Sequence, residues 1–379
     1  MSTRFVGLLS GTSMDAVDAA LVEFAGDTPR LLAHHALPYP DALRQELAAL
    51  ARPGAADGDT LDRLGAADIA LGRLFARAVL ELLADAGVPA DSITAIGSHG
   101  QTVRHRPEGP HPFSLQIGDP NAIAQETGIT TVADFRRRDL AAGGQGAPLA
   151  PAFHAAVFRS EDEDRAVLNL GGIANLTTLP TDPEAAVRGF DSGPANTLLD
   201  AWAQRHLGRP RDDAGAWGQT GTVDATLLAR LRGDDYFLRS PPKSTGPEHF
   251  DLPWLQGHLS GSEAAADVQA TLQALTATTV ADALRDALPE AERLLVCGGG
   301  VHNDALMARL AEAVAPVAVA STAAHGVDPD WVEATAFAWL ARARLAGQPG
   351  NLPAVTGATA PVVLGGVYPG HGRAGLQGS

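Results

Sequence analysis

The segment LSGTSMDAVD, residues 9–18, carries more polar chemistry than a simple chain reversal requires. Apolar stretches flank it on both sides and predict two strands, and a loop that only joins two strands can be shorter. Successive N–H groups and hydroxyls in such a loop can surround a phosphate, and a carboxylate such as Asp15 or Asp18 can hold Mg²⁺ through water. The alternative interpretation is an ordinary polar turn.

Two further glycine-rich segments follow predicted strands. GGIAN, residues 171–175, separates the strands RAVLNL and LTTL and repeats the first hairpin in outline, so the two loops together could hold a triphosphate. GGGVHN, residues 298–303, nearly matches the dinucleotide fingerprint, but Asn303 replaces the last glycine and no acidic residue follows about 20 positions later. These glycines either bring the backbone close to a ligand or only permit tight strand–helix packing.

The segment GFDSGPAN places Asp191 between a predicted strand and the start of a helix. A carboxylate at that place can act as the base that aligns a nucleophile for phosphoryl transfer or hydrolysis. It can equally cap the helix or form an Asx-turn, and both interpretations stay open.

A second group of polar residues consists of candidates for contacting a small ligand. His99, Gln101 and Thr102 lie in SHGQT, a polar loop expected at 98–102, where hydrogen-bonding groups surround the histidine. One of the three arginines at 136–138 can bind a carboxylate through two parallel hydrogen bonds, although a run of charge is usually a solvated surface. Glu333 lies in the first turn of the last predicted helix, where its charge equally offsets the helix dipole.

The composition indicates a folded protein and excludes several functional classes. The chain has 379 residues, of which 45% are hydrophobic and 19% charged, enough for two domains with sizeable cores. Its net charge of −16 disfavours non-specific binding to nucleic acid or to an anionic membrane. Cys297 is the only cysteine, so neither an intrachain disulfide nor a cysteine-based zinc site can form. The sequence has no P-loop and no serine in a G-x-S-x-G elbow.

Hydrophobic periodicity predicts helices that alternate with strands in two halves. The predicted elements are a hairpin over 4–24, helices over 41–51, 60–86, 197–207, 265–288 and 330–345, a strand over 127–135 and a second hairpin over 165–179, with an irregular stretch at 208–262. This pattern predicts an α/β fold in two lobes with a cleft between them. We expect an N-terminal lobe of residues 1–134 plus about 351–379, and a C-terminal lobe of residues 135–350.

Motifs of one family occur along nearly the whole chain in one order. They are GLLSGTSMDAVD (7–18), GSHGQTV (97–103), LQIGDPNAIA (115–124), ADFRRRDLAAGGQGAPL (133–149), LNLGGIANL (168–176), GFDSGPAN (189–196), PKSTGPEHF (242–250), DVQATLQALTA (267–277), LLVCGGG (294–300), VEATAFAWLA (332–341) and NLPAVTGA (351–358). With these segments the chain resembles the anhydro-N-acetylmuramic acid kinase family. That family is similar in fold to the actin, heat-shock chaperone and sugar-kinase ATPases, which implies ATP in the cleft between the lobes.

The resemblance implies a reaction and a set of site residues. The family uses ATP and Mg²⁺ to open the 1,6-anhydro ring of 1,6-anhydro-N-acetylmuramic acid with water and to phosphorylate O6, giving N-acetylmuramic acid 6-phosphate for cell-wall recycling. We expect Asp191 to be the catalytic base and Asp15 to lie at the metal. The expected ATP-binding residues are Gly11, Thr12, Ser13, Met14, Asp15, Ala16, Val17, Asp18, Gly171, Gly172, Asn175, Gly298, Gly299 and Gly300, and the expected sugar contacts are His99, Gln101, Thr102, Asp134, Arg136 and Glu333.

One position departs from the family pattern. The family usually has glycine where this chain has Ala16. If that position needs a positive φ, alanine costs about 1 kcal/mol and alters the loop.

Other functions remain open at this point. A related kinase of 1,6-anhydroglucose would have no need of a cleft arginine, because that sugar lacks the lactyl carboxylate, so Arg136 discriminates between the two. An ATP-driven conformational module would normally carry a partner-binding domain or linker, and none is visible after Gly350. An intact Asp191 disfavours an inactive sugar sensor. Since the N-terminus is no signal peptide, we expect a cytoplasmic homodimer that binds a small-molecule substrate but no nucleic acid or membrane.

Overall fold

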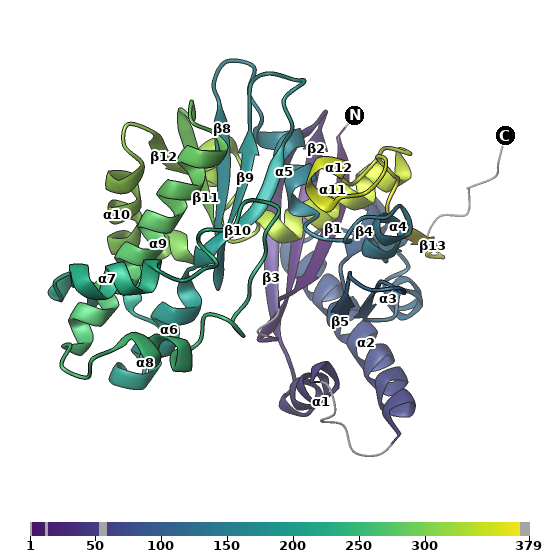
Figure 1. Ribbon diagram of the computed structural model, residues 1–379. Helices are drawn as coiled ribbons and strands as arrows, with labels where there is room; N and C mark the ends of the chain where they lie inside the picture. Colours follow the sequence, from purple (N-terminus) through teal and green to yellow (C-terminus); the bar gives the residue numbers. More distant parts are fainter. Residues whose placement is uncertain (1, 12–13, 53–58, 372–379) are drawn as a thin grey trace. The chain divides into compact units, whose positions relative to one another are not determined.

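The computed structural model describes residues 2–11, 14–52 and 59–371, and the chain divides into two compact units. Unit 1 comprises Met1–Phe153 and Trp331–Ser379, and unit 2 comprises His154–Asp330. Each unit is built on a mixed β-sheet with helices packed against it (Figure 1). The predicted α/β fold in two parts is therefore confirmed. Across the described ranges, no helix combines the length and the apolar character that crossing a bilayer requires.

The sheet of unit 1 has the strand order β13-β7-β4-β1-β2-β3. These strands are β1 (Thr3–Ser10), β2 (Ala16–Ala25), β3 (Thr28–Pro38), β4 (Ile93–Ser98), β7 (Thr131–Ala133) and β13 (Gly366–Tyr368), and β5 (Gln101–Arg106) pairs with β6 (Phe113–Ile117) as a separate ribbon. The helices are α1 (Asp41–Ala51), α2 (Thr60–Ala86), α3 (Pro120–Thr127), α4 (Arg136–Ala141), α11 (Val332–Leu345) and α12 (Pro353–Thr356), with a 3-10 turn η1 (Ala90–Ser92) and α5 (Ala150–Phe158), which crosses into unit 2.

The sheet of unit 1 buries both of its faces. Along β1, Val6 and Leu8 pack in a core that contains Leu71 and Phe75 of α2. The alternate residue Phe5 packs on the other face, in a core that contains residues of α11. This alternation follows from the two-residue period of a strand, and it explains why the first hairpin is almost continuously apolar.

The sheet of unit 2 has the strand order β10-β9-β8-β11-β12. These strands are β8 (Arg165–Leu170), β9 (Ile173–Leu179), β10 (Arg188–Pro194), β11 (Arg293–Cys297) and β12 (Ala318–Ser321). The helices are α6 (Asn196–Leu207), α7 (Ala225–Arg232), α8 (Leu252–His258), α9 (Ala265–Ala287) and α10 (Asp304–Val314), with 3-10 turns η2 (Asp213–Gly215), η3 (Gly218–Thr220), η4 (Gly299–His302) and η5 (Thr322–His325). One continuous apolar core joins the sheet to α6, α7, α9 and α10.

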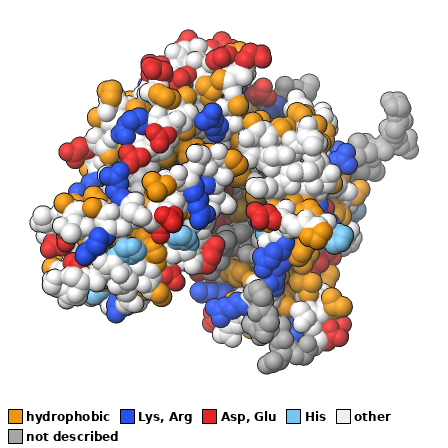
Figure 2. Space-filling model, in the orientation of Figure 1, with side chains coloured by type: hydrophobic (Ala, Val, Ile, Leu, Met, Phe, Trp, Pro, Cys, Tyr) orange, Lys and Arg blue, Asp and Glu red, His pale blue; other side chains and the backbone are white. Residues whose placement is uncertain are grey.

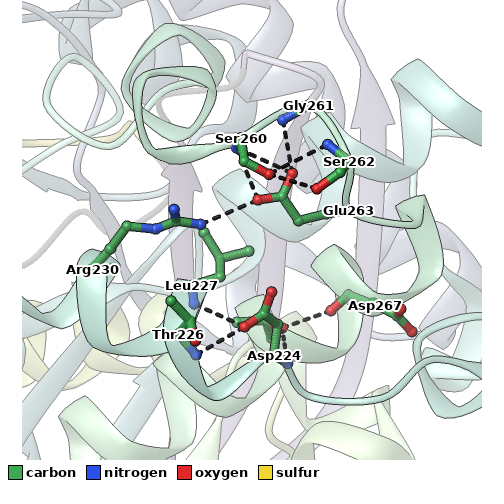
Figure 3. Close-up of polar contacts among 10 residues, drawn as sticks. Asp224, Thr226, Leu227, Arg230, Ser260, Gly261, Ser262, Glu263 and Asp267 are labelled. Atoms are coloured by element: carbon green, nitrogen blue, oxygen red, sulfur yellow. Dashed lines mark hydrogen bonds and ion pairs between the residues drawn. The ribbon is translucent and has the colours of Figure 1, made fainter.

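The stretch at 208–262, predicted to be irregular, contains α7 and α8. Local side-chain caps hold this region in place (Figure 3). The carboxylate of Asp224 accepts hydrogen bonds from the first-turn N–H groups of α7 at 2.8 and 3.0 Å. The carboxylate of Glu263 accepts from the N–H groups of Ser260 and Gly261 and pairs with Arg230 at 3.1 Å. The caps are sequence-local, whereas the pair of Arg230 with Glu263 joins residues 33 positions apart, and hydrophobic periodicity reveals neither.

The two longest predicted helices are confirmed. The helix predicted over 60–86 is α2, whose N-cap Asp59 accepts from the N–H of Leu61 at 2.9 Å and whose C-cap Gly87 has a φ of 63°. The helix predicted over 265–288 is α9, which ends one residue earlier. Length and periodicity are strongest in these two segments, so the sequence predicts them best.

Three predicted boundaries were wrong. The last helix begins at Val332 rather than at Asp330, because the carbonyl of Pro329 accepts the N–H of Gly298 at 2.9 Å instead of starting the helix. The strand predicted over 127–135 shrinks to β7, since α3 continues to Thr127. The polar loop expected at 98–102 is shorter, since β5 already begins at Gln101.

In the structure, the first part of unit 1 ends at Phe153 and its second part begins at Trp331. The sequence had placed the lobe boundaries after 134 and 350. The difference has a packing cause. Phe135 and Leu149, which the sequence assigned to the second lobe, lie in the core of unit 1 beside Phe5. The helix α11 lies in the same core. Periodicity predicts these segments but not the sheet on which they pack.

Two glycines allow α11 to approach the sheet of unit 1 closely. A Cβ atom at Gly7 of β1 would lie 1.8 Å from the carbonyl oxygen of Ala334, and one at Gly97 of β4 would lie 2.0 Å from that of Phe337. Both contacts are to helix backbone, which cannot rotate away as a side chain can. The position of α11 therefore depends on the absence of a side chain at these two positions.

We expect Gly97→Ala to lower the free energy of unfolding by about 3 kcal/mol, the upper end of typical overpacking costs, because the clash is with backbone. Chemical denaturation monitored by circular dichroism measures the change. Gly65→Ala is the matched control, since no atom lies within 4 Å of a Cβ built there in the interior of α2, and it should stabilise by about 0.5–1 kcal/mol. Equal midpoints for Gly97→Ala and the native chain would contradict the close approach.

Candidate active site

The sheet of unit 2 brings two glycine segments and Asp191 to the same end of its strands. β8 and β11 run parallel, with Cys297 beside Asn169, so the segments that follow both strands leave the sheet at the same end. β9 then returns antiparallel to β8, and β10 antiparallel to β9, which places Asp191 directly opposite Asn175. Residues far apart in the sequence thus lie at the same end of the sheet.

Asp191 lies within β10 and not between a strand and a helix, so that prediction was wrong. The N-cap position of α6 is Ala195, so the alternative that Asp191 caps this helix is excluded. A register irregularity occurs between Asp191 and Gly193. The irregularity is of the kind that re-aims a side chain next to a functional site.

Four hydrogen bonds hold Asp191 in place. The side-chain amide of Asn175 donates to one carboxylate oxygen, and the backbone N–H of Thr245 donates to the other at 2.9 Å. The backbone N–H of Asp191 donates to the carbonyl of Lys243 at 3.1 Å, and the hydroxyl of Tyr236 donates to the carbonyl of Asp191 at 2.8 Å. The segment 236–245 therefore orients this carboxylate from outside the sheet.

The environment of Asp191 shifts its pKa upward. The side chain is buried, with 8% of the residue exposed, and this desolvation raises the pKa to about 6, while the hydrogen bond from Thr245 opposes the shift. A carboxylate with a pKa near 6 is a stronger base than an ordinary aspartate and is still mostly ionised at neutral pH. Asp191 has the properties of a general base.

The glycines at this end of the sheet have different local roles. The carbonyls of Gly171 and Gly172 accept the N–H groups of residues 195–197, so the loop is fixed to the start of α6. Cβ atoms at Gly298 and Gly300 would lie 2.3 Å from the side-chain oxygen of Asn169 and 2.5 Å from Leu170, which is the packing alternative for this motif.

Gly299 and Asn175 belong to the same two glycine-rich segments of unit 2. Gly299 has no atom within 4 Å of a Cβ built on it, so it alone of the three glycines at 298–300 leaves open space beside the backbone. Asn175, expected to bind ATP, donates a hydrogen bond to Asp191.

In unit 1 the loop between β1 and β2 takes a tight shape. The N–H of Met14 donates to the carbonyl of Gly11 at 3.2 Å, and Met14 has a φ of 54°. Ala16 begins β2 and is not among the described residues with positive φ, so alanine in place of the family's glycine carries no strain. Val17 is fully buried in the core and presents no side chain to a ligand. Thr12 and Ser13 lie outside the described residues.

Asp15 is the residue of this loop that fits a metal. Its side chain is 66% exposed and its carboxylate lies 3.6 Å from the guanidinium of Arg44. Mg²⁺ in nucleotide-binding proteins usually takes one or two carboxylates, keeps several waters and shares phosphate oxygens. An exposed, weakly paired carboxylate beside a candidate phosphate loop meets that requirement. Within the described ranges, no group of three or more His, Cys, Asp or Glu side chains is arranged to hold a metal ion.

Gln101 and Thr102 make internal contacts. The side-chain oxygen of Gln101 accepts the hydroxyl of Ser10 at 2.6 Å, and Tyr39 donates to the same Ser10 hydroxyl at 2.8 Å. The hydroxyl of Thr102 accepts from Gln116 at 3.0 Å. Gln101 is buried, so it fixes the end of β1, where the loop begins, rather than presenting a polar group to solvent.

The buried His99 and the half-buried Arg136 form a pair in unit 1. The Nε and one terminal nitrogen of Arg136 lie 3.1 and 2.9 Å from Nε2 of His99, and the other terminal nitrogen donates to the carbonyl of Gly146 at 2.8 Å. Burial, with a contribution from Arg136, lowers the pKa of His99 well below its usual value, so the ring is neutral and accepts the hydrogen bond. Burial also lowers the pKa of Arg136 to about 10, so it stays charged at neutral pH.

The other two arginines of the run point elsewhere. Arg137 pairs with Asp134 at 2.6 Å, and Arg138 is exposed. Arg136 is therefore the arginine of the run that is held inside unit 1. Asp134, in turn, has a φ of 62° and lines a cavity of about 390 Å³ together with His99.

Glu333 adds an acidic group to the surroundings of Arg136, and Asp18 acts on Glu333 in turn. Glu333 lies in the first turn of α11, as predicted, and its charge raises the pKa of Arg136 against the effect of burial. Asp18 raises the pKa of Glu333 in addition to the effect of desolvation, so these two carboxylates influence each other. The expected sugar contacts His99, Arg136 and Glu333 are thus brought together in unit 1, whereas Gln101 and Thr102 hydrogen-bond to other side chains of the unit.

The residues that hold Asp191 from outside the sheet were missed as functional residues. PKSTGPEHF, at 242–250, contains Lys243 and Thr245, but nothing in its spacing indicates contact with a strand some fifty positions earlier. Tyr236 lies before this motif. The signal that the sequence offers for Lys243 and Thr245 is the family motif PKSTGPEHF itself.

Comparison with known proteins gives one consistent family. The chain matches the family described as "Anhydro-N-acetylmuramic acid kinase" over residues 3–370. A protein of that name from Coxiella burnetii (strain RSA 493 / Nine Mile phase I) is 53% identical over 366 residues, 96% of this chain and 97% of that one. Another, from Xanthomonas axonopodis pv. citri (strain 306), is 55% identical over 372 residues, 97% of this chain and 98% of that one.

Similarity to solved structures is weaker. Component A of the (R)-2-hydroxyglutaryl-CoA dehydratase of Acidaminococcus fermentans aligns with a TM-score of 0.48 and 12% identity, covering 88% of this chain and 96% of that one. The family assignment therefore rests on the sequence matches.

We expect Asn175→Ala to raise the pKa of Asp191 from about 6 by roughly one unit, because a hydrogen bond to a charged group contributes about 1.5–3 kcal/mol and favours the ionised form. Carbon-13 NMR of aspartate-labelled protein follows the titration. Asn196→Ala is the control, since its amide donates to the carbonyl of Leu170 and not to Asp191. An unchanged titration in Asn175→Ala would contradict the contact.

Proposed function

Since the chain belongs to the anhydro-N-acetylmuramic acid kinase family, we propose that it opens 1,6-anhydro-N-acetylmuramic acid with water and phosphorylates O6 at the expense of ATP. The product is N-acetylmuramic acid 6-phosphate, and the reaction is a step of cell-wall recycling. Magnesium use, a homodimeric state and a cytoplasmic location belong to the same proposal and are carried by the family resemblance alone.

The observation that carries the proposal is the state of Asp191. Its carboxylate is buried, held by Asn175 and Thr245, and has a pKa raised to about 6. A group held in this way can accept a proton from water without having to reorganise. It lies at the end of the sheet where the glycine segments at 171–172 and 298–300 also lie.

The reaction balances with one base and one water. Asp191 takes a proton from water while the water oxygen bonds to C1 and the C1–O6 bond breaks. O6 then bonds to the γ-phosphorus of ATP, and ADP leaves. The anhydro ring contributes strain, and capture of O6 by the phosphoryl group prevents the ring from closing again. Asp191 afterwards releases its proton to solvent.

The phosphate groups require compensating charge. In the proposal, the backbone of the loop that begins at Gly11 and the loop at 171–172 contact the phosphates of ATP, and Asp15 holds Mg²⁺. The metal would neutralise charge on the transferring phosphoryl group. Gly299, with open space beside it, is the glycine of the third segment that best suits a ligand contact.

Unit 1 supplies the proposed sugar contacts. The lactyl group of the substrate carries a carboxylate, and the charged guanidinium of Arg136 is its proposed partner. His99 remains neutral and orients Arg136 through two hydrogen bonds. Glu333 is a proposed acceptor for sugar hydroxyl or amide groups. Asp134, paired with Arg137, is the weakest member of the proposed set.

The proposal is tested by turnover of 1,6-anhydro-N-acetylmuramic acid with ATP and Mg²⁺ in ¹⁸O-water, followed by mass analysis. A 6-phosphate with ¹⁸O at C1 supports coupled hydrolysis and phosphorylation. Asp191→Asn should lower kcat by about 10²–10⁴-fold, the usual contribution of a general base. Turnover of 1,6-anhydroglucose in place of the amino sugar would point to a related kinase. ATP hydrolysis without any sugar turnover would indicate a conformational module.

The pH dependence of the reaction follows from the same carboxylate. Asp191 must be ionised to accept a proton, and its folded-state pKa is about 6. We expect kcat/KM to fall about tenfold per pH unit below pH 6 and to level off above it, in rates measured from pH 4.5 to 8. An acidic limb near pH 4 would contradict the raised pKa.

Arg136→Lys should discriminate between the two sugars. We expect it to lower kcat/KM for 1,6-anhydro-N-acetylmuramic acid by about 10–100-fold, since losing a bidentate contact costs about 1.5–3 kcal/mol. Any residual rate with 1,6-anhydroglucose should stay unchanged, because that sugar has no carboxylate. Arg138→Lys is the matched control at the exposed end of the run. Equal losses with both sugars would assign Arg136 a structural role only.

A further inference from the structure

A pocket of about 570 Å³ lies within unit 2, beside β10. Its lining comes from β10, from the end of α7 and the segment that follows it, and from α9, which is labelled with β10 in Figure 1. Phe190 and Ser192 line the pocket, whereas Asp191 between them does not. Because successive strand residues point to opposite faces, the pocket lies behind the strand as seen from the carboxylate of Asp191.

The lining of this pocket is basic. It contains Arg188, Arg232, Arg239 and Lys243 against two acids, Asp282 and Asp286. Asp282 is already neutralised, since it pairs with Arg232 at 2.5 Å and with Arg285 at 3.0 Å. Arg188, Arg239 and Lys243 have no ion pair with any described residue. Three cations therefore face Asp286 alone.

Two of these cations share one aromatic ring. The guanidinium carbon of Arg239 lies 5.8 Å from the centre of the Tyr236 ring, and Nζ of Lys243 lies 4.9 Å from it. A ring attracts a cation only weakly at an exposed site and cannot cancel the repulsion between two. Burial lowers the pKa of Lys243, Asp286 opposes this effect, and the charge of Arg239 adds a smaller lowering. A negatively charged ligand would give Arg239 and Lys243 the ion-pair partner that the described residues do not supply.

The rest of the chain makes such a basic cluster unusual. The net charge is −16, and acidic side chains gather on the upper edge of the face in Figure 2, above β8 and β9. Acidic loops at 161–164 and 182–184 adjoin the ends of these strands. A basic pocket in an acidic protein concentrates anions where the rest of the surface repels them.

The size and polarity of the pocket define a class of ligand. Its volume falls in the range of about 300–1,000 Å³ that suits small-molecule ligands. Guanidinium groups bind phosphate through paired hydrogen bonds, and Ser192, Ser240 and Thr279 add hydroxyl groups to the lining. Phe237 offers an apolar surface for a sugar ring. These features suit a phosphorylated sugar better than a bare ion.

The pocket is coupled to Asp191 through its own lining. The carbonyl of Lys243 accepts the N–H of Asp191, and the hydroxyl of Tyr236, whose ring carries both cations, donates to the carbonyl of Asp191. Two residues after Lys243, the N–H of Thr245 donates to the carboxylate. A ligand that orders 237–243 would therefore order the groups that hold Asp191.

We propose that this pocket is a regulatory site for a phosphorylated sugar, and that its occupancy raises kcat by ordering the segment that holds Asp191. The binding part stands independently of the reaction. The regulatory part rests on the proposed function, in which Asp191 is the base.

Isothermal titration with glucose 6-phosphate as the probe tests the binding part. We expect saturable binding to the native chain and at least tenfold weaker binding to the double variant Arg188→Gln/Arg239→Gln. Arg209→Gln, an exposed arginine of unit 2 outside the pocket, is the matched control and should bind like the native chain. Inorganic phosphate should bind at least tenfold more weakly than the sugar phosphate. Asp191→Asn should still bind, which separates failure of the site from failure of the proposed reaction.

Turnover with and without glucose 6-phosphate tests the regulatory part. We expect kcat to rise at least twofold with the concentration dependence of the titration, and this rise to vanish in the double variant but not in Arg209→Gln. No saturable binding, equal binding by the double variant, or equal binding of inorganic phosphate would overturn the site. Binding that changes only KM for the sugar would overturn the regulatory role, since that pattern indicates competition for the substrate site.

Discussion

Burial of the Asp191 carboxylate is the constraint around which unit 2 is organised. A carboxylate removed from water is stable only when donors replace the lost hydration, and here Asn175 supplies one donor and the backbone of Thr245 another. Asn175 can do so because it is the cross-strand neighbour of Asp191. The second donor requires the chain to leave the sheet, build α7 and return. The irregular stretch before α9 is therefore part of the site.

Unit 1 depends on a different constraint, the contact of α11 with the sheet. Gly7 and Gly97 let the helix backbone approach the strands, and this places Phe337 with its ring centre 4.8 Å from that of His99. The same helix carries Glu333, whose charge raises the pKa of Arg136. A neutral histidine, a half-buried arginine and a carboxylate are thus positioned by backbone packing, which explains why the glycines of β1 and β4 matter as much as the polar residues.

A buried aspartate links two segments that the sequence separates widely. Asp139 accepts hydrogen bonds from the side chains of Asn351 and Thr356 at 2.6 and 2.7 Å and from the N–H of Gly146 at 2.7 Å. The carbonyl of Gly146 in turn accepts from Arg136. The motifs AAGGQGAPL and NLPAVTGA therefore act together, since one end of this network fixes the chain near residue 351 and the other fixes the arginine.

The sequence by itself determined the α/β class, the long helices, the first hairpin and the residue types of the candidate site, because these follow from local periodicity, caps and short motifs. It also identified the family, since motifs in one order are read without knowledge of the fold. Only the tertiary structure decided that Asn175 holds Asp191, that Gln101 is an internal residue, that Arg136 is the least exposed arginine of its run, and that Ala16 carries no strain. The boundaries of the two units also came from the structure. These properties depend on which segments distant in sequence pack together, and a periodic pattern contains no information about the partner of a side chain across a sheet or beneath a helix.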